Sequence, residues 1–316
     1  METSRHKLTV VVPFLNEAEN LPVLFERLCK VMAGRPETLE VLFVDDGSTD
    51  GSPAWVAEMA KRDSRARLLQ LSRNFGHQIA ITAGLDHAEG DAAVIIDADL
   101  QDPPEVIADL LDKWREGYEV VYAVRRSRQG ETWLKKLLAS SFYRVFRSLA
   151  KVDVPMDAGD FRLVDRKVID ALKQVRELHR FMRGLTCWVG YRQGAVYYDR
   201  DARHAGETKY PVWKSARLAF DAITSFSASP LRWVVGMGVA ACACGLLWFL
   251  QILVSRFLYP MAQERGWASL MAAVIFMGGV QLVSVGMLGQ YVSRIFEETK
   301  RRPLYFLKTP CREKRD

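Results

Sequence analysis

Cysteine is scarce in this chain, with five among 316 residues, at Cys29, Cys187, Cys242, Cys244 and Cys311. None of them has a partner pair at the spacing of a zinc site, and Cys242-Ala-Cys244 lies in an apolar run. An odd number of cysteines without a framework excludes a disulfide-stapled scaffold and indicates reduced thiols in a cytosolic setting. We therefore expect neither a structural zinc site nor disulfide bonds.

The pattern of a secretory signal peptide is also missing. Leu8–Phe14 is too short for the apolar core of such a peptide, and no cleavage site follows it. We expect the N-terminal domain to stay in the cytoplasm. The net charge of +6 allows nucleic acid, an anionic membrane or phosphorylated substrates as partners. No nucleic-acid-binding module or aromatic-basic stripe is found, so we expect no nucleic-acid partner.

Charge is absent from two long stretches near the C-terminus, Trp233–Val254 and Trp267–Ser293. Each is long enough, as a helix, to cross a hydrocarbon core of about 30 Å. Eight basic residues follow the second stretch, and positive-inside counting places them in the cytoplasm. We predict a multi-pass protein of the cell (inner) membrane whose catalytic domain and C-terminus are cytoplasmic. The alternative is a pair of buried helices in a soluble domain.

The first half of the chain alternates short apolar runs with helical patterns, which is typical of βαβ units and a largely parallel sheet. The runs are rich in Val, Ile and Leu, as strands buried on both faces should be. The expected strands are Leu8–Phe14, Glu40–Val44, Arg67–Leu71, Ala92–Asp97 and Glu119–Val124. Ligands of such sheets bind beyond the carboxyl ends of the strands. The residues that follow each strand are therefore the candidates for function.

Asp97-Ala98-Asp99 follows one of these strands. Two carboxylates at a strand end suit Mg²⁺ or Mn²⁺, which take oxygen ligands and commonly bridge to substrate phosphates. Gln101 can add an amide oxygen. The motif alone is weak because aspartate is frequent in surface turns. Its position after a buried strand, with a helix start behind it at Asp102-Pro103, favours the metal site.

Two further strands end in acidic and amide side chains, in VVVPFLNE and VLFVDDGSTD. Pro13 removes a backbone donor near the end of the first strand. Asn16, Glu17, Asp45 and Asp46 can hydrogen-bond a base or a ribose. The alternative is that these side chains only cap helices and form turns.

The pattern loosens after Arg125. We expect a basic helix, a polar turn, a strand and a basic loop, in that order, at Trp133–Ala150, Asp157–Arg162, Gln193–Tyr198 and Arg200–Lys209. Pro211–Ala228 has apolar residues at helical spacing and is expected to lie on the bilayer as an interfacial helix, with a core-packing helix as the alternative. The predicted domains are residues 1–210 (catalytic), 211–232 (interfacial helix), 233–293 (two transmembrane helices) and 294–316 (basic cytoplasmic tail).

The ordered set of these motifs resembles the family 2 glycosyltransferases, which have a GT-A fold, and among them the polyprenyl-phosphate glycosyltransferases. Dolichyl-phosphate mannose synthases and bactoprenol glucosyltransferases are examples of that group. The matching segments cover nearly the whole chain: VVPFLNE, VDDGSTDGS, LSRNFGHQIA, DADLQDPPE, MDAGDFRLVDR, GETKYP and RRPLYFL. The resemblance implies an α/β GT-A domain, Rossmann-like with a mostly parallel sheet, followed by a C-terminal two-helix transmembrane hairpin.

The same resemblance implies roles for individual residues. Pro13, Asn16, Glu17 and Asp45 match nucleotide-binding positions, and Asp97, Asp99 and Gln101 match the metal and diphosphate site. Arg125, Ser140 and Arg144 match acceptor-phosphate contacts. Asp157 matches a proposed catalytic base. Arg200, Arg203 and Lys209 match a basic loop that closes over the diphosphate.

The implied reaction is inverting, metal-dependent transfer of one sugar from a nucleotide sugar, UDP-glucose before others, to undecaprenyl or another polyprenyl phosphate. A phosphate monoester has a second pKa near 6 and needs little deprotonation at neutral pH. Asp157 therefore acts either as a base or only to orient an arginine or the phosphate. GDP-mannose and other UDP-sugars are the alternative donors. The sugar, the base, the polyprenol length, the pathway and the oligomeric state, a homo-oligomer included, stay open.

Two rival functions share features of this sequence. Processive polysaccharide synthases carry a Gln-x-x-Arg-Trp motif, whereas Ser229 precedes Pro-Leu-Arg232-Trp233 here, and two spans are too few for a polymer channel. The rival from another class is a catalytically silent membrane scaffold that binds sugar nucleotides. The intact Asp97, Asp99, Arg125 and Asp157 argue against it.

Overall fold

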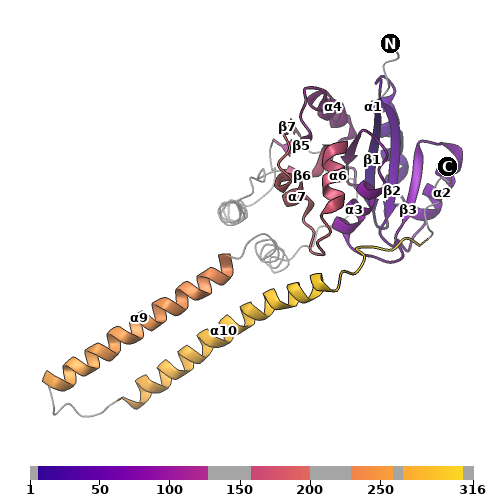
Figure 1. The fold of residues 1–316 in the computed structure, drawn as a ribbon. Coiled ribbons are helices and arrows are strands. Elements are labelled where there is room, and N and C mark those ends of the chain that lie inside the picture. Colours follow the sequence, from indigo (N-terminus) through magenta and orange to yellow (C-terminus); the bar gives the residue numbers. More distant parts are fainter. Residues whose placement is uncertain (1–5, 127–157, 200–228, 259–265, 309–316) are drawn as a thin grey trace. The chain divides into compact units, whose positions relative to one another are not determined.

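The structure is a computed structural model that describes residues 6–126, 158–199, 229–258 and 266–308 (Figure 1). The chain forms two compact units. One comprises Met1–Pro211 together with Pro303–Asp316, and the other comprises Val212–Arg302. The first unit therefore contains both the beginning and the end of the chain.

A seven-stranded sheet forms the centre of the first unit, in the order β3-β2-β1-β4-β6-β5-β7. All neighbours are parallel except β6, which is antiparallel to β4 and β5. This confirms the predicted α/β, mostly parallel sheet. The strands are β1 (Lys7–Phe14), β2 (Thr38–Asp45), β3 (Ala66–Gln70), β4 (Ala92–Ile95), β5 (Val120–Arg125), β6 (Ala158–Asp165) and β7 (Gln193–Tyr198).

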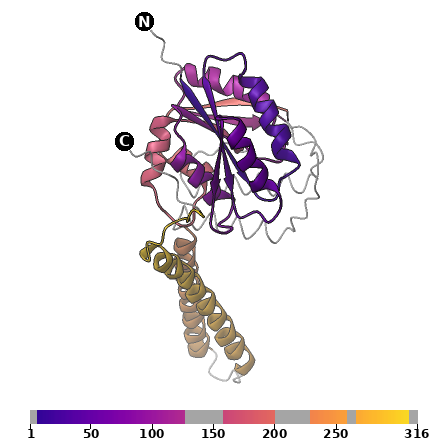
Figure 2. The same ribbon diagram turned by 90° about the vertical axis from the view of Figure 1, so that its right-hand side faces the viewer.

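Helices cover both faces of the sheet (Figure 2). The period of two in β1 explains the layers: Val10 and Val12 belong to the core beneath α1 and α4, whereas Val11 faces Gly84 of α3. Packing of α3 against α6 completes the second layer. The helices of this unit are α1 (Asn20–Met32), α2 (Ser52–Arg62), α3 (His77–His87), the 3₁₀ turn η1 (Pro104–Val106), α4 (Ile107–Arg115), α6 (Arg166–Gln174) and α7 (Met182–Trp188).

The prediction of a polar turn in this unit is wrong. The expected polar turn at Asp157–Arg162 falls largely on β6, a strand buried between β4 and β5. Asp160 and Arg162 gave this stretch its polar appearance, but both are buried, with Arg162 only 1% exposed. Arg162 donates hydrogen bonds to Thr186 and to the carbonyl of Gly159, and it lies against the ring of Tyr122. Its charge is thus accommodated inside the sheet, which a hydrophobicity pattern does not reveal.

The strand directions gather several strand ends on one edge of the sheet. The carboxyl ends of β1, β2, β3, β4, β5 and β7 lie on this carboxyl edge. Because β6 runs the other way, its first residues lie there instead of its last. The strand order reverses between β1 and β4, which is the position where open α/β sheets bind their ligands.

The second unit contains two contacting helices, α9 (Ser229–Leu258) and α10 (Trp267–Thr299). Within the described residues, one segment is long and apolar enough to cross a membrane, Ala273–Thr299 of α10. A shorter apolar segment, Val234–Trp248, lies in α9. Large apolar side chains are exposed on α10, among them Leu282 (76%) and Ile275 (69%). These findings support association with a membrane through α10.

After α10 the chain returns to the sheet of the first unit. Leu307 forms an antiparallel bridge with Leu71, just beyond β3 at the edge of the sheet. The N–H of Ser72 donates to the carbonyl of Phe306 (2.8 Å), and the N–H of Lys308 donates to that of Gln70 (2.9 Å). We call Pro303–Lys308 the tail segment. It covers part of an edge strand that would otherwise present unpaired backbone groups.

Candidate active site

Asp97 and Asp99 follow β4 at the point where the strand order reverses. The turn between them and Asp102 is unusual, because Leu100 adopts a left-handed backbone with φ 59°. The N–H of Gln101 donates to a carboxylate oxygen of Asp99 (3.1 Å), which holds this turn together. Asp97 and Asp99 are half-buried and Gln101 is buried. The structure thus brings the three predicted metal-binding residues, Asp97, Asp99 and Gln101, to one turn. We call this turn the metal-site turn.

The electrostatics of this turn favour a cation. Oδ1 of Asp97 is buried without a hydrogen-bond partner among the described residues. The pKa of Asp97 is raised to about 6, chiefly by burial, with added repulsion from the carboxylates of Asp160, Asp102 and Asp99 and an opposing effect of His77. Since the pKa stays raised despite His77, an ionised Asp97 is only partly compensated, and a divalent cation would supply further positive charge.

Asp97, Asp99 and Gln101 suit Mg²⁺ or Mn²⁺ as a partial ligand set that a substrate completes. In the described part of the chain, no three His, Cys, Asp or Glu side chains are grouped as a ready-made metal site. Magnesium, however, is usually held by one or two carboxylates together with substrate phosphates and water. Two carboxylates and one amide at a strand end match that mode, in which the substrate completes the coordination.

His77 reaches this site from the start of α3. Its Nε2 lies 3.4 Å from Oδ1 of Asp97 and 3.4 Å from Oδ2 of Asp160. Although burial opposes the charged imidazole, Asp160 and Asp97 raise the pKa of His77 above its usual value. On the far side, Arg183 of α7 donates to both oxygens of Asp160, at 2.9 and 3.2 Å. His77 therefore joins the metal-site turn to β6.

The same pairing explains the behaviour of Asp160. Burial alone would raise the pKa of this carboxyl, but His77 and Arg183 hold it well below its usual range. Asp160 is therefore a fixed negative charge. Sequence reasoning missed both residues, because they are 83 positions apart and only the fold brings them together. The one signal in the sequence was the motif match around each of them.

The loops after β1 and β2 are joined by hydrogen bonds. Asn16, with φ 58°, accepts the N–H of Thr49 on its side-chain oxygen (2.8 Å), and its own N–H donates to Ser48 (3.0 Å). The N–H of Glu17 donates to Ser52 (3.0 Å). Asn16 and Glu17 thus lie at the carboxyl edge as predicted and also hold the two loops together. Pro13 is buried in β1, next to its last residue.

The loop after β2 is fixed to the loop after β3. Asp45 is 3% exposed and accepts the N–H of Ser48 (2.8 Å), while Asp46 accepts those of Phe75 and Gly76. Gly47 has φ 84°, and a Cβ there would lie 2.6 Å from the backbone N of Asn74. Only glycine permits this close approach of the two loops. Asp45 is accordingly placed by a rigid frame.

Arg125 ends β5 at the same edge and is held by two buried side chains. Its Nε donates to the hydroxyl of Tyr198 (3.2 Å), and its Nη2 donates to Oδ1 of Asp102 (3.4 Å). Asp102 was expected to begin a helix. The first turn begins after Pro103 instead, and the Asp102 carboxylate accepts hydrogen bonds from Tyr198 and Arg125. Arg125 thus neighbours the metal-site turn.

Several predicted site residues lie outside the described residues. They comprise the candidate base, two acceptor-phosphate contacts and the basic loop: Asp157, Ser140, Arg144, Arg200, Arg203 and Lys209. The predicted basic helix Trp133–Ala150 and interfacial helix Pro211–Ala228 also lie there. These assignments stay predictions.

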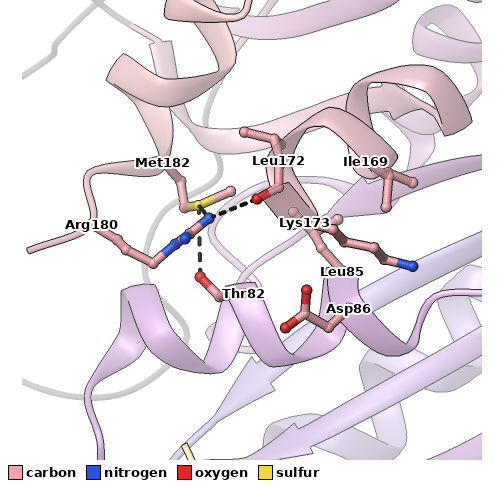
Figure 3. A pocket seen from close by; sticks show the side chains of 8 residues that line it. All are labelled: Thr82, Leu85, Asp86, Ile169, Leu172, Lys173, Arg180 and Met182. Atoms are coloured by element: carbon pink, nitrogen blue, oxygen red, sulfur yellow. Dashed lines mark hydrogen bonds between the residues drawn. The ribbon is translucent and has the colours of Figure 1, made fainter. Parts of the chain in front are cut away.

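A small cavity lies away from this edge (Figure 3). It lies between α3 and α6, near the start of α7, and Arg180 donates to the carbonyl of Leu172 beside it (3.4 Å). Its lining residues are Thr82, Leu85, Asp86, Ile169, Leu172, Lys173, Arg180 and Met182. It shares no residue with the turn that carries Asp97 and Asp99. The candidate active site is the group of polar side chains at the carboxyl edge.

The sheet order, its single antiparallel strand and the carboxylate pair after β4 define a GT-A-like α/β domain. A solved structure with a similar fold is mannosyl-3-phosphoglycerate synthase from Rubrobacter xylanophilus. The TM-score is 0.50 at 19% identity, over 72% of this chain and 74% of that one. At this identity the likeness concerns the fold alone.

Sequence comparisons identify the family. Residues 9–173 match the model of glycosyl transferase family 2. The chain is 47% identical over 305 residues to an uncharacterized glycosyltransferase, YkcC, of Bacillus subtilis (96% of this chain, 94% of that protein). It is 38% identical over 302 residues to the bactoprenol glucosyl transferase of Shigella phage SfV (96% of this chain, 98% of that protein). The chain therefore belongs to glycosyl transferase family 2 and is a glycosyltransferase, as its motifs predicted.

Proposed function

We propose that this glycosyltransferase moves a single sugar from a nucleotide sugar to polyprenyl phosphate at the cytoplasmic face of a membrane. UDP-glucose is the favoured donor and undecaprenyl phosphate the favoured acceptor. The observation that carries the proposal is the 38% identity, over nearly the full length of both chains, to proteins named bactoprenol glucosyl transferase. The candidate site supports it with a carboxylate pair for a donor diphosphate and a guanidinium for a second phosphate, both at one edge of the sheet.

The donor side of the proposal rests on the turn after β4. We assign Asp97, Asp99 and Gln101 to a divalent metal, Mg²⁺ or Mn²⁺, which when bound neutralises the charge that develops on the departing diphosphate. The proposed contacts to the base, the ribose and the diphosphate are Pro13, Asn16, Glu17, Asp45, Arg200, Arg203 and Lys209. A base or ribose is bound well by such a frame, because the loops after β1 and β2 are already joined by hydrogen bonds.

The acceptor side rests on Arg125, with Ser140 and Arg144. A guanidinium binds phosphate oxygens with two parallel hydrogen bonds, which gives direction as well as attraction. The side chain of Arg125 is 23% exposed, so a ligand can reach it. Hydrogen bonds to Tyr198 and Asp102 hold its guanidinium in place. A phosphate bound there lies beside the turn that carries Asp97 and Asp99.

The proposed reaction is a single displacement. An oxygen of the acceptor phosphate forms a bond to the anomeric carbon, the bond from that carbon to the donor diphosphate breaks, and the electron pair leaves with the nucleoside diphosphate. This inverts the anomeric carbon. The acceptor is largely dianionic at neutral pH, so no proton has to be removed first. Asp157 then acts by orienting an arginine or the phosphate, or as a base for the singly protonated fraction.

The membrane arrangement is part of the proposal. Alongside the apolar segment of α10, the uncharged stretch Trp233–Val254 of α9 is proposed as a second span, making a hairpin with both ends in the cytoplasm. The proposed organisation is residues 1–210 as catalytic domain, 211–232 as interfacial helix, 233–293 as transmembrane helices and 294–316 as a basic cytoplasmic tail. Its location would be the cell (inner) membrane.

The test uses the purified full-length protein with a short-chain polyprenyl phosphate, a panel of nucleotide sugars, and Mg²⁺ either present or removed by a chelator. The mass of the lipid product identifies the sugar. We expect a lipid gaining one hexose from UDP-glucose only when Mg²⁺ is present. A product from GDP-mannose or another UDP-sugar would correct the donor. Binding of a nucleotide sugar without any lipid product would favour the silent scaffold.

A further inference from the structure

We infer that Tyr198 is a positioning residue that, with Asp102, orients the guanidinium of Arg125 toward the acceptor phosphate; the acceptor part of this inference rests on the proposed function. The three side chains come from different elements. Arg125 ends β5, Tyr198 ends β7, and Asp102 lies in the turn after β4. The parallel register of β5 and β7 pairs Arg125 with Tyr198 directly.

Arg125 donates hydrogen bonds to Tyr198 and to Asp102, and Asp102 is the final acceptor. Nε of Arg125 donates to the Tyr198 hydroxyl (3.2 Å), and that hydroxyl donates to Oδ1 of Asp102 (2.5 Å). Nη2 of Arg125 donates to the same carboxylate oxygen (3.4 Å). Burial and the nearby Asp102 raise the pKa of Tyr198, so the hydroxyl keeps its proton and its role as donor.

These hydrogen bonds occupy one edge of the planar guanidinium group of Arg125. Nε and Nη2 face Tyr198 and Asp102, and within the described part of the chain Nη1 has no hydrogen-bond partner. A guanidinium has five N–H donors in fixed directions, so fixing one edge also fixes where the remaining donors point. Because the side chain is partly exposed, these remaining donors can bind an anion without prior reorganisation.

Tyr198 and Asp102 are themselves held rigidly by the residues packed around them. Tyr198 and Asp102 are 5% and 1% exposed, and the ring of Phe161 packs edge-on against Tyr198, with centroids 5.9 Å apart. A Cβ at Gly159 would lie 3.3 Å from Nη2 of Arg125. Glycine at this position therefore leaves room for the guanidinium. Because Asp102 follows Gln101 directly, the same contacts tie Arg125 to the metal-site turn.

The test is steady-state kinetics of the full-length enzyme with Tyr198→Phe, which removes only the hydroxyl. We expect the KM for polyprenyl phosphate to rise about tenfold, the effect of losing one hydrogen bond to a charged group, with the KM for the nucleotide sugar unchanged. The matched control is Tyr197→Phe. Tyr197 is the preceding residue of β7 and is 59% exposed, so its variant should behave as wild type.

A double-mutant cycle separates positioning from a merely structural role. Arg125→Lys keeps the charge but lacks the Nε–H that contacts Tyr198. In that background, Tyr198→Phe should change the acceptor KM less than about twofold, because coupled residues are non-additive. An equal loss in both backgrounds, or kinetics equal to those of Tyr197→Phe, would overturn the inference.

Two further results keep the outcomes distinct. If Tyr198→Phe does not fold, Gly159→Ala places a Cβ 3.3 Å from Nη2, so the guanidinium must shift and the acceptor KM should rise; wild-type kinetics of that variant would count against the inference. If the cycle is non-additive but the nucleotide-sugar KM changes instead, Tyr198 still positions Arg125, and the proposed acceptor role of Arg125 fails. Absence of any lipid product from the wild type refutes the proposed function and, with it, the acceptor half of the inference.

Discussion

Nε2 of His77 lies 3.4 Å from the buried Oδ1 of Asp97, an oxygen with no hydrogen-bond partner among the described residues. The same nitrogen lies 3.4 Å from Asp160, which Arg183 holds from the other side. The first carboxylate of the motif is thus supported by a chain of charges that begins on α7 and crosses β6. Outer partners of this kind orient metal ligands and fix their charge.

We expect His77→Ala to lower kcat/KM for the nucleotide sugar by about 10–100-fold, the usual effect of removing a partner of a metal ligand. His77→Gln should keep part of the activity, because its amide can still donate to one carboxylate. Kinetics over a Mg²⁺ titration measure both, with the exposed His6→Ala as control. Wild-type values for His77→Ala would show that the contact has no functional role.

Asp99→Ala should lower transfer by about 10²-fold or more, since it removes one of two carboxylates proposed to hold the metal against the diphosphate. Insertion into the membrane should be unchanged. Asp109→Ala on the exposed face of α4 is the matched control. Full activity of the purified Asp99 variant would rule out the metal-site assignment.

Arg125→Ala should mainly raise the KM for the lipid or lower kcat, leaving the affinity for the nucleotide sugar near wild type. The reason is that Arg125 is held beside the metal-site turn by Asp102 rather than within it. Calorimetric titration with the nucleotide sugar, beside lipid kinetics, separates the two substrates. A large loss of donor affinity would reassign Arg125 to the diphosphate.

Gly84→Ala should destabilise the first unit, although alanine is the better helix former by about 1 kcal/mol. A Cβ at Gly84 would lie 2.2 Å from Cγ1 of Val11 and 3.1 Å from Cγ2 of Val44. Both neighbours are fully buried and stiff at χ1, so α3 must move away from the sheet. Overpacking of this kind costs about 1–3 kcal/mol.

Thermal unfolding followed by near-UV circular dichroism measures this effect. Gly34→Ala is the control, because nothing lies within 4 Å of a Cβ there. A Tm for Gly84→Ala at or above that of the control would show that the helix–sheet contact yields without strain.

Removal of residues 303–316 should lower the stability of the first unit by about 1–3 kcal/mol, through the lost backbone hydrogen bonds to β3 and its continuation. The bond from the Tyr305 hydroxyl to Asp86 (3.1 Å) is lost as well. Removal of residues 309–316 alone keeps these contacts and is the matched control. Equal unfolding temperatures for the two truncations would show that the tail segment adds no stability.

The sequence predicted the sheet well where hydrophobicity alone decides. Val10–Val12 and Ala92–Ile95 are strands, as short apolar runs between helical patterns predict. It failed at β6, where Asp160 and Arg162 are buried through ion pairing and hydrogen bonding to distant residues. It also gave no sign of the tail segment, whose pairing beside β3 depends on backbone hydrogen bonds to residues more than 200 positions away.

The candidate site was predictable as a set of residue types and only partly as a geometry. Asp97 and Asp99 follow a recognisable strand, so their placement could be inferred. The roles of His77 and Tyr198 could not, because each depends on a partner 20 to 96 positions away that only the sheet order brings near. Asp102 illustrates the limit, since a helix-start signal concealed a side chain held by β5 and β7.

The reversed direction of β6 determines where the segment between β5 and β6 joins the sheet. Because β5 ends and β6 begins at the carboxyl edge, the intervening residues 127–157 are joined to the sheet at that edge on both sides. Residues 200–228 are joined there too, after β7. Changes in either stretch can therefore alter the carboxyl edge while the pairing of the seven strands stays the same.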